Sequence, residues 1–183
     1  MATTGLLLID IQNDYFPGGP MELEGAEIAA IRAADLLGYF RSQAWPIAHV
    51  QHISLRPGST FFLPDTEGAL IRPEVEPIVA EPVFVKHYPN SFRETGLHKW
   101  LQDHHIVELV IAGMMTHMCV DASTRAAFDL GYSCTVISDA CATRRLSFQG
   151  REIPAQDVQG TILAALQGTY ADVLDSAVYL TRR

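Results

Sequence analysis

The stretch IVELVIAGMMTHMCVDASTRAAFDLG, residues 106–131, changes from one backbone pattern to another part-way along. Its first part, residues 106–112, is a nearly continuous apolar run, which is typical of a buried strand. The run breaks at Gly113, and a helical pattern that begins near residue 118 stops at Gly131. We therefore expect a strand, a turn and a helix in succession, with Cys119 at the beginning of the helix. Because the amides and dipole at that end of a helix favour anions, we expect a lowered thiol pKa.

Apolar runs of strand length and helical patterns also alternate along the rest of the chain. Further strands are predicted at residues 5–11, 46–50, 83–85, 132–138 and 173–180. Further helices are predicted at residues 29–40, 97–104 and 158–166. Nearly continuous apolar strands that alternate with helices indicate a parallel sheet covered on both faces. The sequence thus predicts a three-layer α/β/α fold with a doubly wound, mostly parallel, Rossmann-like sheet, whose ligand crevice lies beyond the carboxyl ends of its strands.

The length and composition fit one globular domain. The chain has 183 residues, of which 48% are hydrophobic and 19% charged, so we expect a single domain over residues 1–183. No run of about 18 apolar residues occurs, and the first residues lead directly into the apolar run at residues 6–9. We therefore expect neither a signal peptide nor a membrane span.

The net charge and the cysteines limit the kinds of binding partner and the cellular compartment that fit this sequence. The formal net charge of −8 argues against a nucleic-acid or anionic-membrane surface, because both need clustered Lys and Arg. Cys119, Cys134 and Cys141 cannot all pair, and they lack the two-residue spacing of a zinc or redox motif. We interpret them as reduced thiols of a cytoplasmic protein.

Residues 54–82 form an unusually long connection that contains five prolines. A loop of that size in a compact domain is usually functional. We expect it to provide pocket walls or subunit contacts, with a short helical turn within residues 71–79.

Three residues with reactive side chains lie where different predicted strands end. Asp10 is embedded in a buried run, Lys86 follows another, and Cys119 follows a third. Taken alone, each residue has an ordinary structural explanation. Asp10 could cap the following loop, the aliphatic part of the Lys86 side chain could cover apolar surface, and Cys119 could be a packing residue of the core. Since the carboxyl ends of parallel strands meet at one edge, we expect the three side chains to share the crevice.

The segments around these residues resemble the motifs of the isochorismatase-like hydrolases, also called cysteine hydrolases. IDIQNDYF at residues 9–16 resembles the first-strand motif, KHYPNSF at 86–92 the lysine motif and GMMTHMCV at 113–120 the nucleophile motif. The resemblance covers essentially the whole chain. It implies a catalytic triad of Asp10, Lys86 and Cys119, a cis peptide between Met114 and Met115, and an oxyanion hole formed by the backbone amides of Met115 and Cys119.

The resemblance also implies an activity. Enzymes that cleave the vinyl ether of isochorismate do not need the cysteine, so Cys119 favours hydrolysis of a carbon–nitrogen bond in a small-molecule amide through a thioester. Ether cleavage is the alternative within the family. A homo-oligomer, dimeric or larger, is expected on family grounds. The residues beside the motifs that we select as candidate substrate contacts are Phe16, Tyr88, Phe92, His117 and Met118.

Other interpretations of the site remain open. Nicotinamidases of this family bind a metal through Asp-x-His, but residues 48–53 read AHVQHI without the aspartate, so we expect no metal and no cofactor. His49 and His52 would point to opposite faces of a strand, and a pocket role for His52 stays open. His117 could act as the base of a Cys–His pair. From other classes, Cys119 could be a redox-sensing thiol, or the chain could be an inactive interaction protein.

Overall fold

A six-stranded sheet forms the centre of the computed structural model, which describes residues 3–182. Met1, Ala2 and Arg183, which belong to the predicted single domain, lie outside the described residues. The strand order is β3-β2-β1-β4-β5-β8, and all neighbouring strands are parallel. The strands are β1 (Thr3–Ile9), β2 (Ile47–His52), β3 (Val83–Lys86), β4 (Ile106–Met114), β5 (Ser133–Ala142) and β8 (Asp172–Leu174).

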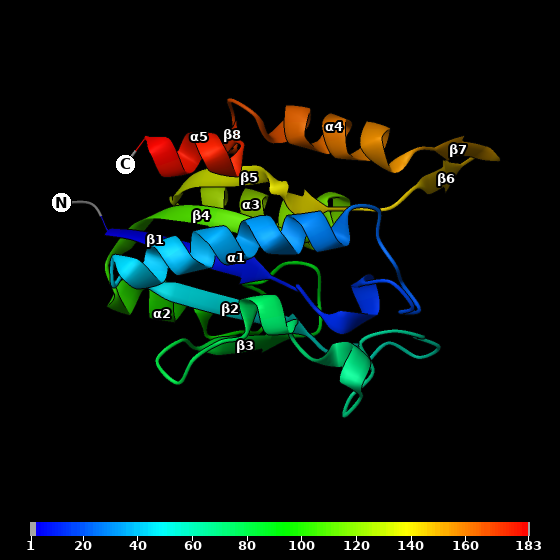
Figure 1. Cartoon of the computed structure of the whole chain (residues 1–183), viewed down its shortest axis with the longest axis horizontal. Coiled ribbons are helices and arrows are strands. Elements are labelled where there is room, and N and C mark those ends of the chain that lie inside the picture. The colour runs from blue at the N-terminus through cyan, green and yellow to red at the C-terminus, as the bar shows by residue number, and fades with distance from the viewer. Residues whose placement is uncertain (1–2, 183) are drawn as a thin grey trace.

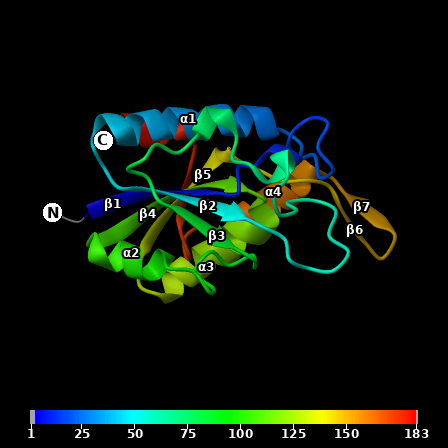
Figure 2. The same ribbon diagram turned by 90° about the horizontal axis from the view of Figure 1, so that it is seen from below.

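Helices cover both faces of the sheet (Figures 1 and 2), so the predicted three-layer α/β fold is confirmed. One face is covered by α1 (Ala26–Ser42) and α5 (Ser176–Thr181). The other is covered by α2 (Leu97–Asp103), α3 (Asp121–Asp129) and α4 (Ala155–Leu166). No helix of the described residues is long and apolar enough to cross a membrane.

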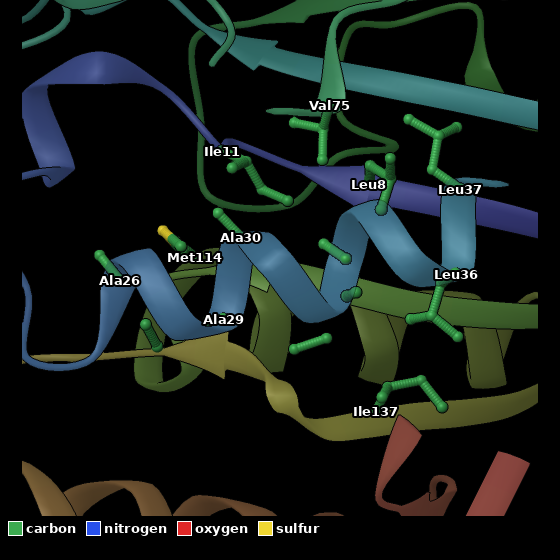
Figure 3. Close-up of a cluster of buried hydrophobic side chains, with 14 of the residues drawn as sticks. Leu8, Ile11, Ala26, Ala29, Ala30, Leu36, Leu37, Val75, Met114 and Ile137 are labelled. Atoms are coloured by element: carbon green, nitrogen blue, oxygen red, sulfur yellow. The ribbon is translucent and has the colours of Figure 1, made fainter. Parts of the chain in front are cut away.

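The period-two alternation of β1 divides the core between the two faces. Leu6 and Leu8 pack under α1, whereas Leu7 and Ile9 belong to the cluster beneath α2 and α3. Figure 3 shows Leu8 close to α1, whose inner face carries the small residues Ala29 and Ala30. Such small side chains let the helix lie close to the sheet, and burial on both faces explains why the strand is a continuous apolar run.

The order of the strands places a crevice beside β1. The chain runs from β1 outward through β2 to β3, and then returns to β4 on the other side of β1. Neighbouring strands whose connections leave in opposite directions open a crevice at their carboxyl ends. In Figure 1 this is the end of the sheet toward which the strand arrows of β1 and β5 point.

The prediction of a strand over residues 173–180 is wrong in part. Only β8 is extended, and the chain then forms α5. The carboxylate of Asp139 accepts hydrogen bonds from the backbone N–H and the hydroxyl of Ser176, each at 2.7 Å, at the start of α5. Tyr179 then stacks on Phe40 of α1. A short apolar run does not distinguish strand from helix, and here tertiary contacts decide.

Two further regions differ from the sequence-based expectation. The helix expected from residue 118 begins as a π-helical turn, Thr116–Val120, which precedes α3. A hairpin of β6 (Leu146–Phe148) and β7 (Arg151–Ile153) was not predicted and projects from one end of the molecule (Figure 1). Its two turn residues, Gln149 and Gly150, both have positive φ, as a tight hairpin turn requires.

The long connection between β2 and β3 contains little regular structure. Short 3-10 turns occur at Glu67–Ala69 (η2) and Pro73–Val75 (η3), and the second is the helical turn expected within residues 71–79. Val75 is fully buried in the core under α1 (Figure 3), whereas Val79 is fully exposed. The connection is therefore fastened to the body of the protein at Val75 and at other buried residues, such as Phe62 and Ala69, while parts such as Val79 remain on the surface.

Candidate active site

The ammonium group of Lys86 is the centre of a buried cluster at the carboxyl end of the sheet. Its Nζ lies 2.6 Å from Asp10 Oδ2, 3.2 Å from Cys119 Sγ and 3.0 Å from Nδ1 of His52. A lysine ammonium has three N–H donors, so each donor has one acceptor here. Asp10 and Lys86 form a fully buried ion pair. The structure thus brings together the three residues that the sequence places at different strand ends, and it adds His52.

The backbone at the end of β1 directs the Asp10 carboxylate into this cluster. Asp10 has φ +52°, in the left-handed region that non-glycine residues rarely adopt. Its N–H donates to Val50 O at 3.0 Å, and its own carbonyl accepts from the Gln12 N–H at 3.0 Å. Residues held in such conformations cluster at functional sites, where the surrounding structure fixes them.

Cys119 reaches the cluster from the π-helical turn after β4. The peptide bond between Met114 and Met115 is cis. The Met115 carbonyl accepts hydrogen bonds from the N–H groups of Met118 and Val120, at 3.0 and 3.2 Å, which closes the turn around Cys119. The side chain of Cys119 is almost completely buried.

The thiol of Cys119 is protonated in the resting site. Burial, followed by the negative charge of Asp10, raises the pKa of Cys119, and the opposing effect of Lys86 is smaller. The expectation of a lowered thiol pKa at a helix end is therefore wrong: the thiol lies in the turn before α3 and is shielded from water. Burial also opposes the charge on Lys86, but Asp10 and Cys119 outweigh burial and raise the pKa of Lys86. The site holds a neutral thiol beside an ion pair.

His52 is a neutral member of the cluster. Burial, followed by the charge of Lys86, lowers the pKa of His52 to about 4. Because an ammonium only donates, the ring Nδ1 of His52 is an acceptor and the neutral ring carries its proton on Nε2. The buried Gln12 amide bonds both the N–H and the C=O of His52, at 2.7 and 2.9 Å, and so fixes the end of β2. His49, three residues earlier, instead contacts Glu81 at 2.9 Å.

The atoms that could ligate a metal in this region already surround a cation. The side-chain donor atoms of Asp10, His52 and Cys119 lie within 4.8 Å of one another. The same three side chains are the hydrogen-bond acceptors of Lys86 Nζ. A metal ion among them would have to displace the ammonium, so the donor set is arranged around Lys86.

A pocket of about 210 Å³ opens beside the cluster, with Cys119 in its wall. The long connection after β2 provides much of this wall, as expected for residues 54–82. The described residues that line the pocket are Tyr15, His52, Ser54, Arg56, Ser59, Phe61, His87, Pro89, Met115, Met118 and Cys119. A larger hollow of about 710 Å³ lies beside the beginning of α1 and contains none of the cluster residues.

Of the five candidate substrate contacts, Met118 lines this pocket and the other four lie elsewhere. Phe16 is buried under the guanidinium of Arg72. The ring of Tyr88 is covered by Arg93, and the ring of Phe92 stacks on that of Tyr132.

His117 is also directed away from the thiol. Its Nδ1 lies 2.5 Å from the hydroxyl of Thr143, so the structure does not pair His117 with Cys119. Four of the five residues chosen beside the motifs thus lie outside this pocket, and Met118 lies in it. Four of the lining residues, Ser54, Arg56, Ser59 and Phe61, come from the long proline-containing connection, which the sequence does signal.

Comparison with known proteins agrees with the fold. A family model described as the isochorismatase domain matches residues 4–167. The chain is 49% identical to the isochorismatase family protein YddQ of Bacillus subtilis, over 97% of this chain and 99% of that protein. It is 30% identical to the nicotinamidase of Escherichia coli, over 77% of this chain and 84% of that enzyme. A solved isochorismatase-family structure from Oleispira antarctica superposes with a TM-score of 0.94 at 48% identity, covering 98% and 96% of the two chains.

A three-layer α/β fold with a buried cysteine, lysine and aspartate beside a small pocket defines an enzyme of the cysteine hydrolase class. The chain belongs to the isochorismatase family.

Proposed function

We propose that this enzyme hydrolyses a small-molecule amide, with Cys119 as nucleophile and a thioester as intermediate. The observation that carries the proposal is the position of Lys86 Nζ, which contacts both the Asp10 carboxylate and Cys119 Sγ next to a pocket. The nicotinamidase relative, whose name states an amide substrate, supports the same class of bond.

Asp10 is the proposed base for the thiol. Its second oxygen, Oδ1, is buried and has no hydrogen-bond donor among the described residues. That oxygen is therefore available to take the proton of Cys119, while Lys86 stabilises the sulfur as it becomes a thiolate. A raised thiol pKa fits this order of events, because the proton leaves only when substrate is present to be attacked.

The remaining steps conserve atoms and charge. The Cys119 sulfur bonds to the amide carbon, and the tetrahedral oxyanion is held by the backbone N–H groups of Met115 and Cys119, both of which line the pocket. Asp10 passes its proton to the nitrogen, the carbon–nitrogen bond breaks, and the amine leaves. Asp10 then takes a proton from water, whose oxygen attacks the thioester carbon. The carbon–sulfur bond breaks, the carboxylic acid leaves, and Asp10 returns its proton to the sulfur of Cys119.

The environment of Cys119 disfavours the redox-sensing alternative. Such thiols are accessible and have a low pKa. Here the thiol is 4% exposed and its pKa is raised by burial. Cleavage of a vinyl ether is the alternative within the family. It does not need a cysteine nucleophile, so it gives the Lys86–Cys119 contact no role in the reaction.

A panel of small amides tests the proposal through ammonia release. We expect turnover of at least one amide by the native enzyme, complete loss in Cys119→Ala, and at most a small residue of activity in Cys119→Ser. Cys134→Ala is the matched control, since Cys134 is also buried but lies outside the pocket. Full turnover by Cys119→Ala would reject Cys119 as the nucleophile.

We further propose that residues 1–183 act as one domain, in the cytoplasm and as a homo-oligomer. Three free cysteines fit a reducing compartment. Exposed Ile28 and Ile31, three residues apart on α1, offer an apolar surface for subunit contact.

A further inference from the structure

The residues that line the active-site pocket include an exposed arginine, Arg56, that the proposed mechanism does not use. Arg56 is the only arginine or lysine among the described residues that line this pocket, and no aspartate or glutamate lines it. Within residues 3–182, no hydrogen bond or ion pair engages the Arg56 side chain. Five other arginines of the chain do pair with carboxylates: Arg32, Arg41, Arg72, Arg93 and Arg125.

A tight turn fixes the backbone that presents Arg56. Pro57 and Gly58 occupy the central positions, Gly58 has φ +79°, and the Ser59 N–H donates to the Arg56 carbonyl at 3.1 Å. Proline followed by a positive-φ glycine is the pattern of a type II turn. The ends of the loop are closed by a 2.8 Å hydrogen bond from the Ser54 N–H to the Phe62 carbonyl.

The loop is also fastened to the core beside the pocket. Asp14, which follows β1, accepts a hydrogen bond from the Phe62 N–H at 2.6 Å. Gly68 passes so close to the Asp14 carboxylate that a Cβ would lie 1.9 Å from its Oδ1. The guanidinium therefore extends from a backbone that is held on both sides, and it requires no reorganisation of the loop to meet a ligand.

The charged groups around the pocket do not provide a negative charge that balances the guanidinium of Arg56. Asp10 and Lys86 neutralise each other in their ion pair. His52 is neutral, because its pKa is lowered to about 4, and the thiol of Cys119 is protonated. Arg56 thus leaves one unbalanced positive charge at the edge of a small pocket, and one negative charge on the ligand would balance it.

We propose that Arg56 binds a carboxylate of the substrate, so that this enzyme acts on small amides that carry one carboxylate. This substrate class rests on the proposed amide hydrolysis, which brings the scissile amide to Cys119. The planar guanidinium matches a carboxylate with two parallel N–H donors. The volume of about 210 Å³ is below the range of roughly 300–1,000 Å³ usual for ligand pockets, which favours a compact amido acid.

Alkylation of Cys119 tests the anion site without any need for turnover. Iodoacetate and iodoacetamide react in the same way: sulfur bonds to the methylene carbon, iodide leaves, and the thiol proton passes to Asp10 and then to solvent. The two reagents differ in the charge of one end. The rate at Cys119 is measured for each by peptide mass spectrometry, in the native enzyme and in Arg56→Gln, Arg56→Lys and the control Arg151→Gln, an exposed arginine of the hairpin outside the pocket.

We expect the ratio of the iodoacetate rate to the iodoacetamide rate to fall about tenfold in Arg56→Gln, equivalent to loss of one charged contact of about 1.4 kcal/mol. We expect the ratio in Arg56→Lys to lie between those of the native enzyme and Arg56→Gln, and the ratio in Arg151→Gln to equal that of the native enzyme. An unchanged ratio in Arg56→Gln overturns the proposal. A Cys119 that reacts with neither reagent also overturns it, because the anion site would deliver iodoacetate to the thiol.

Succinamate and succinamide, which differ in one carboxylate, connect this result to catalysis. We expect Arg56→Gln to lower the ratio of kcat/KM for succinamate to kcat/KM for succinamide about tenfold. If the alkylation ratio falls in Arg56→Gln as expected and no amide is hydrolysed, the proposed anion site is supported and the proposed amide hydrolysis is rejected. If the enzyme hydrolyses amides but does not prefer succinamate to succinamide, the proposed amide hydrolysis is supported and the proposed anion site is rejected.

Discussion

At the scale of single residues, the site is organised by the three donors of one ammonium group. Lys86 contacts a carboxylate, a thiol and an imidazole, and each contact is buried or partly buried. Such a group holds its partners in position as well as supplying charge. Burial is the main reason why the pKa of the Cys119 thiol is raised and that of His52 is lowered; Asp10 adds to the first shift and Lys86 to the second.

Removing one partner of the buried pair has a predictable cost. Lys86→Met leaves the Asp10 carboxylate buried without its counter-charge, and we expect the free energy of unfolding to fall by about 3–5 kcal/mol. The double variant Asp10→Asn/Lys86→Met removes the orphaned charge and should recover part of that loss. Urea unfolding followed by tryptophan fluorescence measures both. A cost below about 1 kcal/mol in Lys86→Met would show that the pair is solvated rather than buried.

The sequence could predict some of these residues and not others. Asp10, Lys86 and Cys119 converge because each follows a buried strand of a parallel sheet, and the sequence reveals that pattern directly. A pocket role for His52, the last residue of β2, was left open by the sequence. The position of Arg56 depends on the path of the loop after β2, which has no periodicity to interpret. The pKa of Cys119 depends on how deeply the turn is buried, and no local pattern reports that depth.

At the scale of elements, the contact between β1 and β4 positions the site. Ile9 of β1 pairs with Gly113 of β4 directly before Asp10 and before the turn that holds Cys119. A Cβ on Gly113 would lie 2.0 Å from the carbonyl oxygen of Ile9, and Gly113 has φ +139°. Only glycine lets these two strand ends approach this closely.

Gly113→Ala should therefore separate the strand ends. We expect it to reduce the free energy of unfolding by about 2 kcal/mol or more, through backbone strain and the clash with Ile9, and to impair activity. Gly38→Ala, in the interior of α1 with nothing within 4 Å of the added Cβ, is the control and should stabilise the protein by about 0.5–1 kcal/mol. Thermal unfolding compares the two. Equal behaviour of both variants would contradict the role of the β1–β4 contact.

The elements that the sequence predicted wrongly are those whose form depends on distant partners. The long strands β1, β4 and β5 are clear from their apolar runs. The short α5 depends on Asp139, which lies 37 residues earlier in the chain than Ser176. The hairpin of β6 and β7 has strands of three residues each, too short for a pattern, and only the turn at Gln149 and Gly150 signals it.

At the scale of the whole molecule, the fold leaves surfaces that one chain does not cover. Ile28 is 65% exposed and Ile31 is 55% exposed on the outer side of α1. We expect light scattering after size exclusion to give a multiple of 20.2 kDa at micromolar concentration. The double variant Ile28→Glu/Ile31→Glu should lower that mass by charge repulsion within an apolar contact. A mass of one chain for the native protein would reject the proposed homo-oligomer.

The central claim is that an acyl group of the substrate becomes attached to Cys119, and partition of that acyl group tests it most directly. Two amides of the same acid with different leaving amines are turned over in the presence of hydroxylamine, and the hydroxamate and free acid are measured. A shared thioester predicts the same hydroxamate-to-acid ratio from both amides, and no product from Cys119→Ala. Ratios that follow the leaving amine, or hydroxamate formed by Cys119→Ala, would contradict the account.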